Sequence, residues 1–213
     1  MFTTDEVNAK LAAGEPSVIR LKIPDNETIT FDDIIRGQIS FESNTLDDFV
    51  LLKTDGFPTY HLANVIDDHS MKISHVLRGD EWITSAPKHV LLYRAFGWET
   101  PIWAHLPVIL SETGGKLSKR KGAASVMDYY HEGVLPHALF NFLALLGWSP
   151  GDDKEIMSID EMIDLFTLDR IGAKPSVFDS KKLEWMNGQL SNAPDRAILE
   201  GELSSLYCRA TLS

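Results

Sequence analysis

Residues 114–125, GGKLSKRKGAAS, concentrate positive charge in a chain whose formal net charge is −11. Glycines on both sides give the segment conformational freedom, and Ser118 adds a hydroxyl donor. Cations on a hinged loop suit a triphosphate, because positive charge aimed at a leaving group stabilises the transition state. The Walker A spacing is absent, and a solvated surface loop or a nuclear import signal would have the same composition. The candidate catalytic residues of this segment are Lys116, Ser118 and Lys119, with Arg120 and Lys121 beside them.

A second group of polar residues lies in TYHLANV and VLRGDEW. Tyr60 and Asn64 are spaced to share one helix face, and Arg78 stands at the C-terminal end of a short apolar strand. Open α/β sheets place ligands at such strand ends, and an arginine can hold a carboxylate by two parallel hydrogen bonds. The alternatives are a core tyrosine, an asparagine that bridges a turn, and an ordinary ion pair of Arg78 with Asp80 or Glu81.

The elements that would position these residues change in type near residue 55. Residues 17–53 are predicted to form strands: SVIRLKI alternates two sets of side chains, and TITFDD, IIRGQISFE and DFVLLKT follow between turn residues. Strands this close in sequence favour antiparallel hairpins. The order helix, strand, helix, strand follows and favours parallel βαβ units. The second of these helices has Ser85 as its expected N-cap and Gly97 as its terminator.

From residue 128 onward the pattern is helical. One predicted helix carries an apolar face made by Leu135, Leu139, Phe142 and Leu146. Another begins with a capping box from Ser158 to Glu161. The last is expected to run from an N-cap at Asp179 to a stop at Gly188, and no role is assigned beyond residue 192.

Composition limits the class of protein. A chain of 213 residues with 44% hydrophobic and 24% charged residues is globular rather than disordered. The single cysteine, Cys208, excludes an internal disulfide, and no Cys/His cluster has the spacing of a zinc site, so we expect a reducing, cytoplasmic setting, no zinc and no protein-bound metal. No signal peptide or membrane span is predicted. A pI near 5.0 argues against coating a polyanion, although a local basic loop can still contact phosphates.

KLSKR resembles the second signature of class I aminoacyl-tRNA synthetases, and KLSKRKG is similar to the glutamyl subgroup. Upstream, residues 56–98 resemble glutamyl-tRNA synthetase throughout, and a weaker likeness continues through FDSKKLEWMNG. The resemblance implies an α/β fold: part of an inserted α+β acceptor-binding domain at 1–53, the second half of the Rossmann catalytic domain at 54–145, and a helical stem-contact region with the tail at 146–213.

The resemblance also implies roles for single residues. Tyr60, Asn64 and Arg78 look like the residues that bind glutamate. The nucleotide would be bound by Glu81, Trp82, Val108, Ile109 and Lys119. His61 and His105 are interpreted as packing residues. The implied substrates are glutamate, ATP with Mg²⁺, and the acceptor arm of tRNA(Glu).

The family's first signature, His-Ile-Gly-His, is not matched by any of the seven histidines. We therefore expect an internal piece of a synthetase, without the anticodon-binding domain, that is inactive alone and self-associates through an exposed half-sheet. The alternatives are a non-catalytic remnant that binds the tRNA acceptor arm, a relative that glutamylates a queuosine base of tRNA, and a glutaminyl enzyme.

Overall fold

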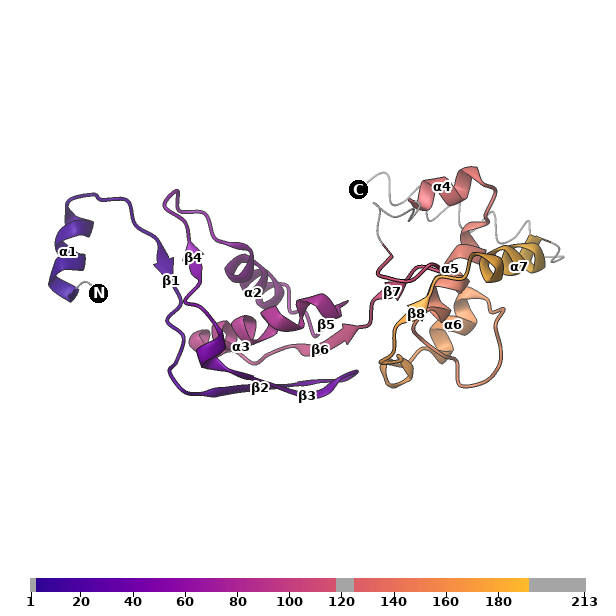
Figure 1. Ribbon diagram of the computed structural model, residues 1–213, viewed down its shortest axis with the longest axis horizontal. Coiled ribbons are helices and arrows are strands. Elements are labelled where there is room, and N and C mark those ends of the chain that lie inside the picture. Colours follow the sequence, from indigo (N-terminus) through magenta and orange to yellow (C-terminus); the bar gives the residue numbers. More distant parts are fainter. Residues whose placement is uncertain (1–2, 118–124, 192–213) are drawn as a thin grey trace. The chain divides into compact units, whose positions relative to one another are not determined.

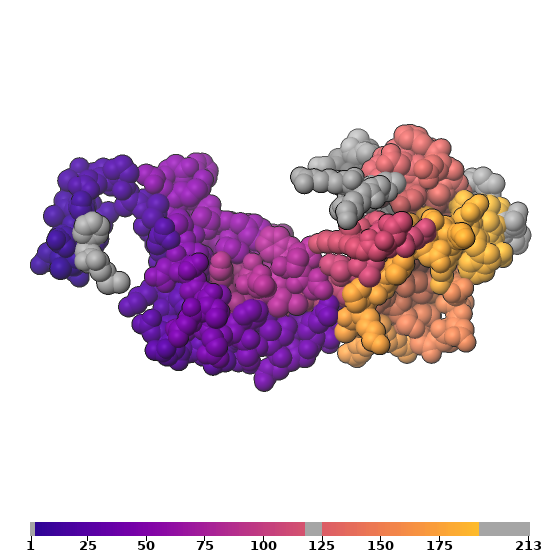
Figure 2. Space-filling view, in the orientation of Figure 1, coloured from indigo at the N-terminus to yellow at the C-terminus, as the bar shows by residue number. Residues whose placement is uncertain are grey.

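The computed structural model describes residues 3–117 and 125–191. The chain divides into two compact units, residues 1–105 and residues 106–213. Both are seen as ribbons in Figure 1 and as space-filling surfaces in Figure 2, where colour follows the sequence from indigo to yellow.

Unit 1 contains a four-stranded sheet in the order β3-β2-β6-β5. Its strands are β2 (Thr28–Asp33), β3 (Gly37–Glu42), β5 (His75–Gly79) and β6 (Ile102–Leu106). The hairpin β2–β3 is antiparallel, whereas β2 meets β6 in parallel at Asp33 and Trp103. A second, two-stranded antiparallel sheet pairs β1 (Ile19–Arg20) with β4 (Val50–Leu52). The antiparallel prediction for residues 17–53 is thus confirmed.

Strand β2, which was predicted from TITFDD, alternates exposed and buried residues. Its inward side chains are Ile29, Phe31 and, unexpectedly for a core position, Asp33, which is 2% exposed. A buried carboxylate requires hydrogen-bond donors close by. Those donors belong to the candidate site.

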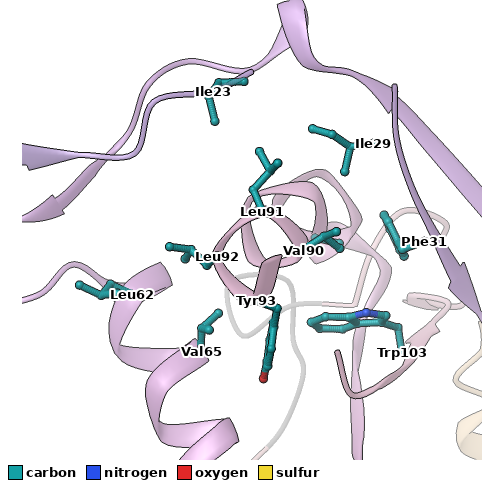
Figure 3. Packing of buried hydrophobic residues seen from close by; sticks show 11 residues of the cluster. Ile23, Ile29, Phe31, Leu62, Val65, Val90, Leu91, Leu92, Tyr93 and Trp103 are labelled. Carbon is teal, nitrogen blue, oxygen red and sulfur yellow. The ribbon is translucent and has the colours of Figure 1, made fainter. Parts of the chain in front are cut away.

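Two helices, α2 (Tyr60–Ser70) and α3 (Ala86–Phe96), complete the core of unit 1. Figure 3 shows α3 between α2 and the sheet: Leu92 faces Leu62 and Val65, while Val90 faces the Phe31 side. Burying these aliphatic side chains stabilises the unit by about 1.5–3 kcal/mol for each side chain that is fully removed from water. The remaining elements of the unit are α1 (Thr4–Ala12) and the 3₁₀ helices η1 (Ser43–Thr45) and η2 (Asp80–Ser85).

The ends of α3 show one correct and one wrong prediction. Gly97 terminates the helix in the left-handed conformation, with φ of 70°. Ser85 precedes the helix but its side chain makes no capping hydrogen bond. The reason is that η2 runs directly into α3, so Ser85 already has helical dihedral angles and does not adopt the extended backbone of an N-cap.

Unit 2 is mainly helical, with a two-stranded parallel sheet of β7 (Ile109–Leu110) and β8 (Ser176–Val177). Its helices are α4 (Val126–His131), α5 (Pro136–Leu145), α6 (Ile159–Leu165), η4 (Leu168–Arg170) and α7 (Ser180–Ser191). One cluster packs α5 against α7 through Leu139, Phe142, Leu146, Leu183 and Met186. This confirms three residues of the predicted apolar face, whereas the fourth, Leu135, lies before the helix at its N-cap and is not in the cluster.

The helix starts of unit 2 agree with the sequence. Ser158 and Glu161 form the predicted capping box, and Asp179 accepts from the Lys182 N–H at 3.0 Å. The predicted stop at Gly188 is wrong, because α7 continues to Ser191. Burial of Leu190 beyond the glycine supplies more free energy than the roughly 1 kcal/mol that a helical glycine costs.

The compact units divide the chain at 105/106, whereas the family-based regions have boundaries at 53/54 and 145/146. The four-stranded sheet and its core take residues from both sides of 53/54. The family-based regions describe binding roles rather than compactness, and they stay a prediction.

Candidate functional site

Arg78 lies at the C-terminal end of β5, and its guanidinium is held on two sides by histidines. Its Nε donates to His105 Nε2 at 3.0 Å, and its Nη1 lies 3.4 Å from His89 Nδ1. Its Nη2 is buried and has no hydrogen-bond partner among the described residues. A guanidinium has five N–H donors and no acceptor, so Arg78 retains donor capacity for a further ligand.

A directed chain of hydrogen bonds runs from Arg78 to the buried carboxylate on β2. Because Arg78 can only donate, His105 Nε2 must accept, and the ring proton is therefore on Nδ1. That Nδ1–H donates to Asp33 Oδ2 at 2.6 Å, and the His105 backbone N–H donates to the same oxygen at 3.0 Å. Asp33 Oδ1 accepts from the N–H groups of Ile35 and Arg36. Both oxygens of the carboxylate are thus satisfied.

A second chain runs from Arg78 through His89 to His61. With Arg78 donating to His89 Nδ1, the Nε2–H of His89 donates to His61 Nδ1 at 3.0 Å. Burial, and then the positive charge of Arg78, lowers the pKa of His89 to about 3. Burial also lowers the pKa of His61 and of His105, although the Asp33 hydrogen bond opposes the shift at His105. These neutral rings add no positive charge beside the guanidinium.

Aromatic rings surround the guanidinium. Arg78 Cζ lies 5.0 Å from the ring centroid of Trp103 and 5.9 Å from that of Trp82. Tyr60 is 5.2 Å from Trp82, centroid to centroid, and remains 53% exposed, so it is not a core aromatic. A site with apolar walls and one charged donor strengthens an ion pair inside it. Burial accordingly lowers the pKa of Arg78 from its ordinary value, without a nearby acid to offset the effect fully.

The other polar residues predicted near Arg78 do not hydrogen-bond its guanidinium, which contacts His105 and His89 instead. The ion pair expected as an alternative for Arg78 does not form, because Asp80 pairs with Arg36 at 2.9 Å. Asn64, one turn beyond Tyr60 on α2, is half-buried, and burial raises the pKa of Asp68, one turn further along the same helix. Glu81 is exposed within η2.

The start of the basic segment is a hairpin in unit 2. The Leu117 N–H donates to the Ile109 carbonyl at 2.8 Å, and Lys116 forms an antiparallel bridge with Leu110. Gly114 and Gly115 turn the chain with φ of 87° and 79°. Lys116 is therefore exposed on the return strand of a hairpin and not on an open loop. The remaining predicted residues of this segment, Ser118 and Lys119 with Arg120 and Lys121, lie outside the described residues.

The hairpin is fastened to the start of α7. Glu112 Oε1 accepts from both the backbone N–H and the hydroxyl of Ser180 at 2.6 Å, and these bonds lower the pKa of Glu112. Val108 and Ile109, predicted to contact adenine through the backbone, precede the hairpin turn. The Ile109 carbonyl already accepts from Leu117, so an adenine would use its second lone pair or a neighbouring group.

Unit 1 thus brings together Tyr60, Arg78 and Trp82, with Asn64 on the same helix as Tyr60. Sequence reasoning missed Asp33 and His89, and it interpreted His105 as packing only. His105 is indeed fully buried, but it also binds Arg78. The available signal was an aspartate at an inward position of an alternating strand.

Two general features concern the described residues only. No helix among them has both the length and the apolar character needed to cross a membrane. Within the same ranges, no three His, Cys, Asp or Glu side chains are grouped so that they could hold a metal ion.

Comparison with known proteins gives a consistent result. Residues 1–185 match the family described as tRNA synthetases class I (E and Q), catalytic domain. A glutamate–tRNA ligase of Clostridioides difficile (strain 630) is 51% identical over 198 residues, which are 93% of this chain and 40% of the relative. A glutamate–tRNA ligase of Chloroherpeton thalassium is 54% identical over 186 residues, 86% of this chain and 37% of the relative. The chain therefore spans about two fifths of the length of these relatives.

Solved structures agree. A crystal structure of a glutamate tRNA ligase from Elizabethkingia meningosepticum, in complex with its amino acid, is similar over 98% of this chain and 45% of its own, with a TM-score of 0.85 and 45% identity. A glutamate–tRNA synthetase from Elizabethkingia anophelis gives a TM-score of 0.84. The mixed α/β fold, the sequence identity and the match over residues 1–185 together show that this chain belongs to the catalytic-domain family of the class I tRNA synthetases for glutamate and glutamine.

Proposed function

We propose that this chain carries the glutamate-binding part, and a share of the nucleotide-binding part, of a glutamate–tRNA ligase. In that reaction the α-carboxylate of glutamate attacks the α-phosphate of ATP, which gives glutamyl-adenylate and pyrophosphate. The terminal hydroxyl of the tRNA then takes the glutamyl group and AMP leaves. ATP enters with Mg²⁺ as a substrate complex, and the work assigned to the protein is positioning and charge stabilisation.

The observation that carries the proposal is the arrangement of Arg78. Within the described residues no carboxylate pairs with this half-buried guanidinium, and its Nη2 has no acceptor. A charged donor without an acceptor, enclosed by Tyr60, Trp82 and Trp103, is unfavourable unless a ligand supplies the acceptor. The side-chain carboxylate of glutamate has the required charge and planar shape.

This arrangement favours glutamate over glutamine. An amide would present one acceptor and one N–H₂ donor to a group that can only donate. One of the two hydrogen bonds would be lost and replaced by a clash of donors. Because Nη2 is enclosed, we expect the ligand to enter only when a neighbouring ring, such as the half-exposed Tyr60, moves aside.

The residues proposed to bind the nucleotide are those that the family resemblance implies, Glu81, Trp82, Val108, Ile109 and Lys119, and the proposed catalytic residues are Lys116, Ser118 and Lys119. The hairpin that Glu112 fastens to Ser180 supports this assignment, because it provides a fixed base from which the basic residues begin. Closure of the segment over ATP during the first step is part of the proposal.

Binding of the amino acid tests the proposal directly. We expect glutamate, titrated into the ¹⁵N-labelled chain, to shift the Arg78 Nε–H and Trp82 indole resonances, and glutamine to bind at least about tenfold more weakly. Arg78→Lys should weaken glutamate binding by roughly tenfold or more, since lysine lacks the planar fork. The matched control is Arg94→Lys, at a surface ion pair with Glu27. No shift at tens of millimolar glutamate, or equal binding of glutamine, would overturn the proposal.

Activity tests the rest. We propose that the 213-residue chain alone does not exchange pyrophosphate into ATP in a glutamate-dependent way. Substituted for the matching 198 residues of the Clostridioides difficile relative, it should support charging of tRNA, and the same chimera with Arg78→Lys should not. A well-folded chimera that binds ATP and tRNA but never charges would contradict the assignment.

Two further parts of the proposal concern partners. Contact with the acceptor arm of tRNA(Glu) should give weak binding that falls linearly with salt on logarithmic axes; salt-dependent RNA binding without any glutamate binding would favour a non-catalytic remnant instead. Self-association is proposed through β5, an edge strand with Leu77 exposed, and Ile102 is exposed on the neighbouring β6. Sedimentation showing only monomer at high concentration would refute it. A cytoplasmic location accords with the family.

A further inference from the structure

We propose that His105, oriented by Asp33, is a positioning residue that leaves Nη2 of Arg78, and the Nη1 N–H that is not directed at His89, for the substrate carboxylate. The inference rests on the proposed function of Arg78 and adds to it the geometry of binding. With Nε occupied by His105, the carboxylate meets Nη1 and Nη2 end-on, and the side-on pair of Nε and Nη2 is not used.

Asp33 has a fixed position. Its carboxylate receives four hydrogen bonds: the N–H groups of Ile35 and Arg36 on Oδ1, and the N–H and Nδ1–H of His105 on Oδ2. Asp33 is also the residue at which β2 pairs with β6, where it lies opposite Trp103. Backbone groups of two separate segments therefore fix the carboxylate, and the carboxylate fixes the imidazole.

The tautomer of His105 is also fixed. Asp33 takes the proton-bearing Nδ1 of His105, so Nε2 presents a lone pair to Arg78 at 3.0 Å. A purely structural Asp–His pair in a core would not need this lone pair to end on a guanidinium. Here the Nε2 lone pair of His105 holds Nε of Arg78, and this contact fixes the direction in which Nη1 and Nη2 extend.

Asp33 differs from an ordinary buried polar residue because its charge state determines the tautomer of His105. Asp33→Asn keeps the shape but can offer an N–H₂ donor where Oδ2 was, because Oδ1 must still accept from Ile35 and Arg36. Nδ1 of His105 would then accept, and its proton would move to Nε2, opposite the Arg78 Nε–H. Two donors would face each other, and the Arg78 side chain would be displaced.

The test begins with the unmodified 213-residue chain. A long-range ¹H–¹⁵N experiment on ¹⁵N-histidine at neutral pH should show His105 as the neutral Nδ1–H tautomer, and the Arg78 Nε–H should exchange slowly with water. An Nε2–H tautomer, an imidazolium, or a rapidly exchanging Arg78 Nε–H would overturn the proposal without any substitution.

Variants then connect position to binding. His105→Leu removes the acceptor and should weaken glutamate binding by roughly tenfold to a hundredfold. His105→Gln, whose amide oxygen can replace Nε2, should lose less than about fivefold and keep the Arg78 Nε–H protected. Asp33→Asn should switch the tautomer and abolish the protection. The matched control is His137→Gln, a buried histidine of unit 2 bonded to the Met157 carbonyl, which should leave the Arg78 resonance unchanged.

The two proposals can fail separately. If Arg78→Lys loses glutamate binding but His105→Leu does not, the positioning role is wrong and the proposed function stands. If the chain binds no glutamate, the proposed function fails, yet the tautomer and the Nε–H protection still decide whether His105 holds Arg78. In an Arg78→Lys background, His105→Leu should add less than about a twofold effect; a full additive loss would show that His105 acts independently of Arg78.

Discussion

The buried histidine His89 makes the stability of unit 1 depend on pH. Its side chain is fully buried, between Arg78 and His61, and its folded pKa is about 3, against an ordinary value of 6.5. The folded pKa is lowered, so between these two values the unfolded chain binds the extra proton and the folded chain does not. Stability is therefore lost as pH falls from 6.5 towards 3.

The size of the effect follows from the two pKa values. At pH 5 the proton taken up by unfolded His89 costs unit 1 about 2 kcal/mol relative to pH 7, and the full cost near pH 3 is ~5 kcal/mol. His61 and His105 act in the same direction because their pKa values are also lowered, whereas Asp68, with a raised pKa, acts in the opposite direction. The range from pH 7 to pH 5 keeps ordinary carboxylates out of the comparison.

The assay is urea unfolding at pH 7, 6 and 5, followed by the indole resonance of Trp103, which lies in the core of unit 1. The control variant is His89→Gln, which keeps polar contacts but cannot titrate. We expect the wild type to lose about 2 kcal/mol more than the variant between pH 7 and pH 5. If both lose the same free energy, His89 is not the buried neutral group described here, and the directed chain from Arg78 through His89 is wrong.

Three further substitutions test single elements. Gly188→Ala should stabilise unit 2 by about 0.5–1 kcal/mol, because the residue is inside α7 and no atom of the described residues lies within 4 Å of an added Cβ; a loss in the urea midpoint would contradict the helical position. Asn141→Ala should destabilise the same unit by ~2 kcal/mol, because the buried amide bonds both Met157 N–H and Glu155 O; an unchanged midpoint followed at the Trp148 indole would show these bonds to be dispensable. Gly97→Ala should cost unit 1 about 1 kcal/mol through its φ of 70° alone, measured at Trp103, since space for a Cβ is open.

Local pattern was sufficient for most of the elements. TITFDD was predicted to be a strand, and the capping box at Ser158 predicted the start of α6. The failures at Ser85 and Gly188 have one cause: a short-range signal was overruled by what comes next in the chain or by burial further along the helix. Propensities near 1 kcal/mol cannot decide such cases.

The site was predicted only as far as chemistry is visible in residue types. A lone arginine after a strand suggested a carboxylate, and Tyr60 and Trp82 do lie beside it. The residues that hold Arg78 were not predictable, because His105 and Asp33 are 72 positions apart and meet only through the pairing of β2 with β6. Contacts across such a distance depend on register, which periodicity does not specify.

The parallel pairing of β2 with β6 also has an evolutionary consequence. Asp33 comes from the hairpin before α2, whereas its partner His105 comes after α3. A recombination event that exchanged residues 1–53 with those of a distant homologue could replace Asp33, the hydrogen-bond partner of His105. It would also replace the strand that pairs with β6 at Trp103. The two segments must therefore be inherited together, and a substitution at position 33 should be accompanied by a substitution at position 105.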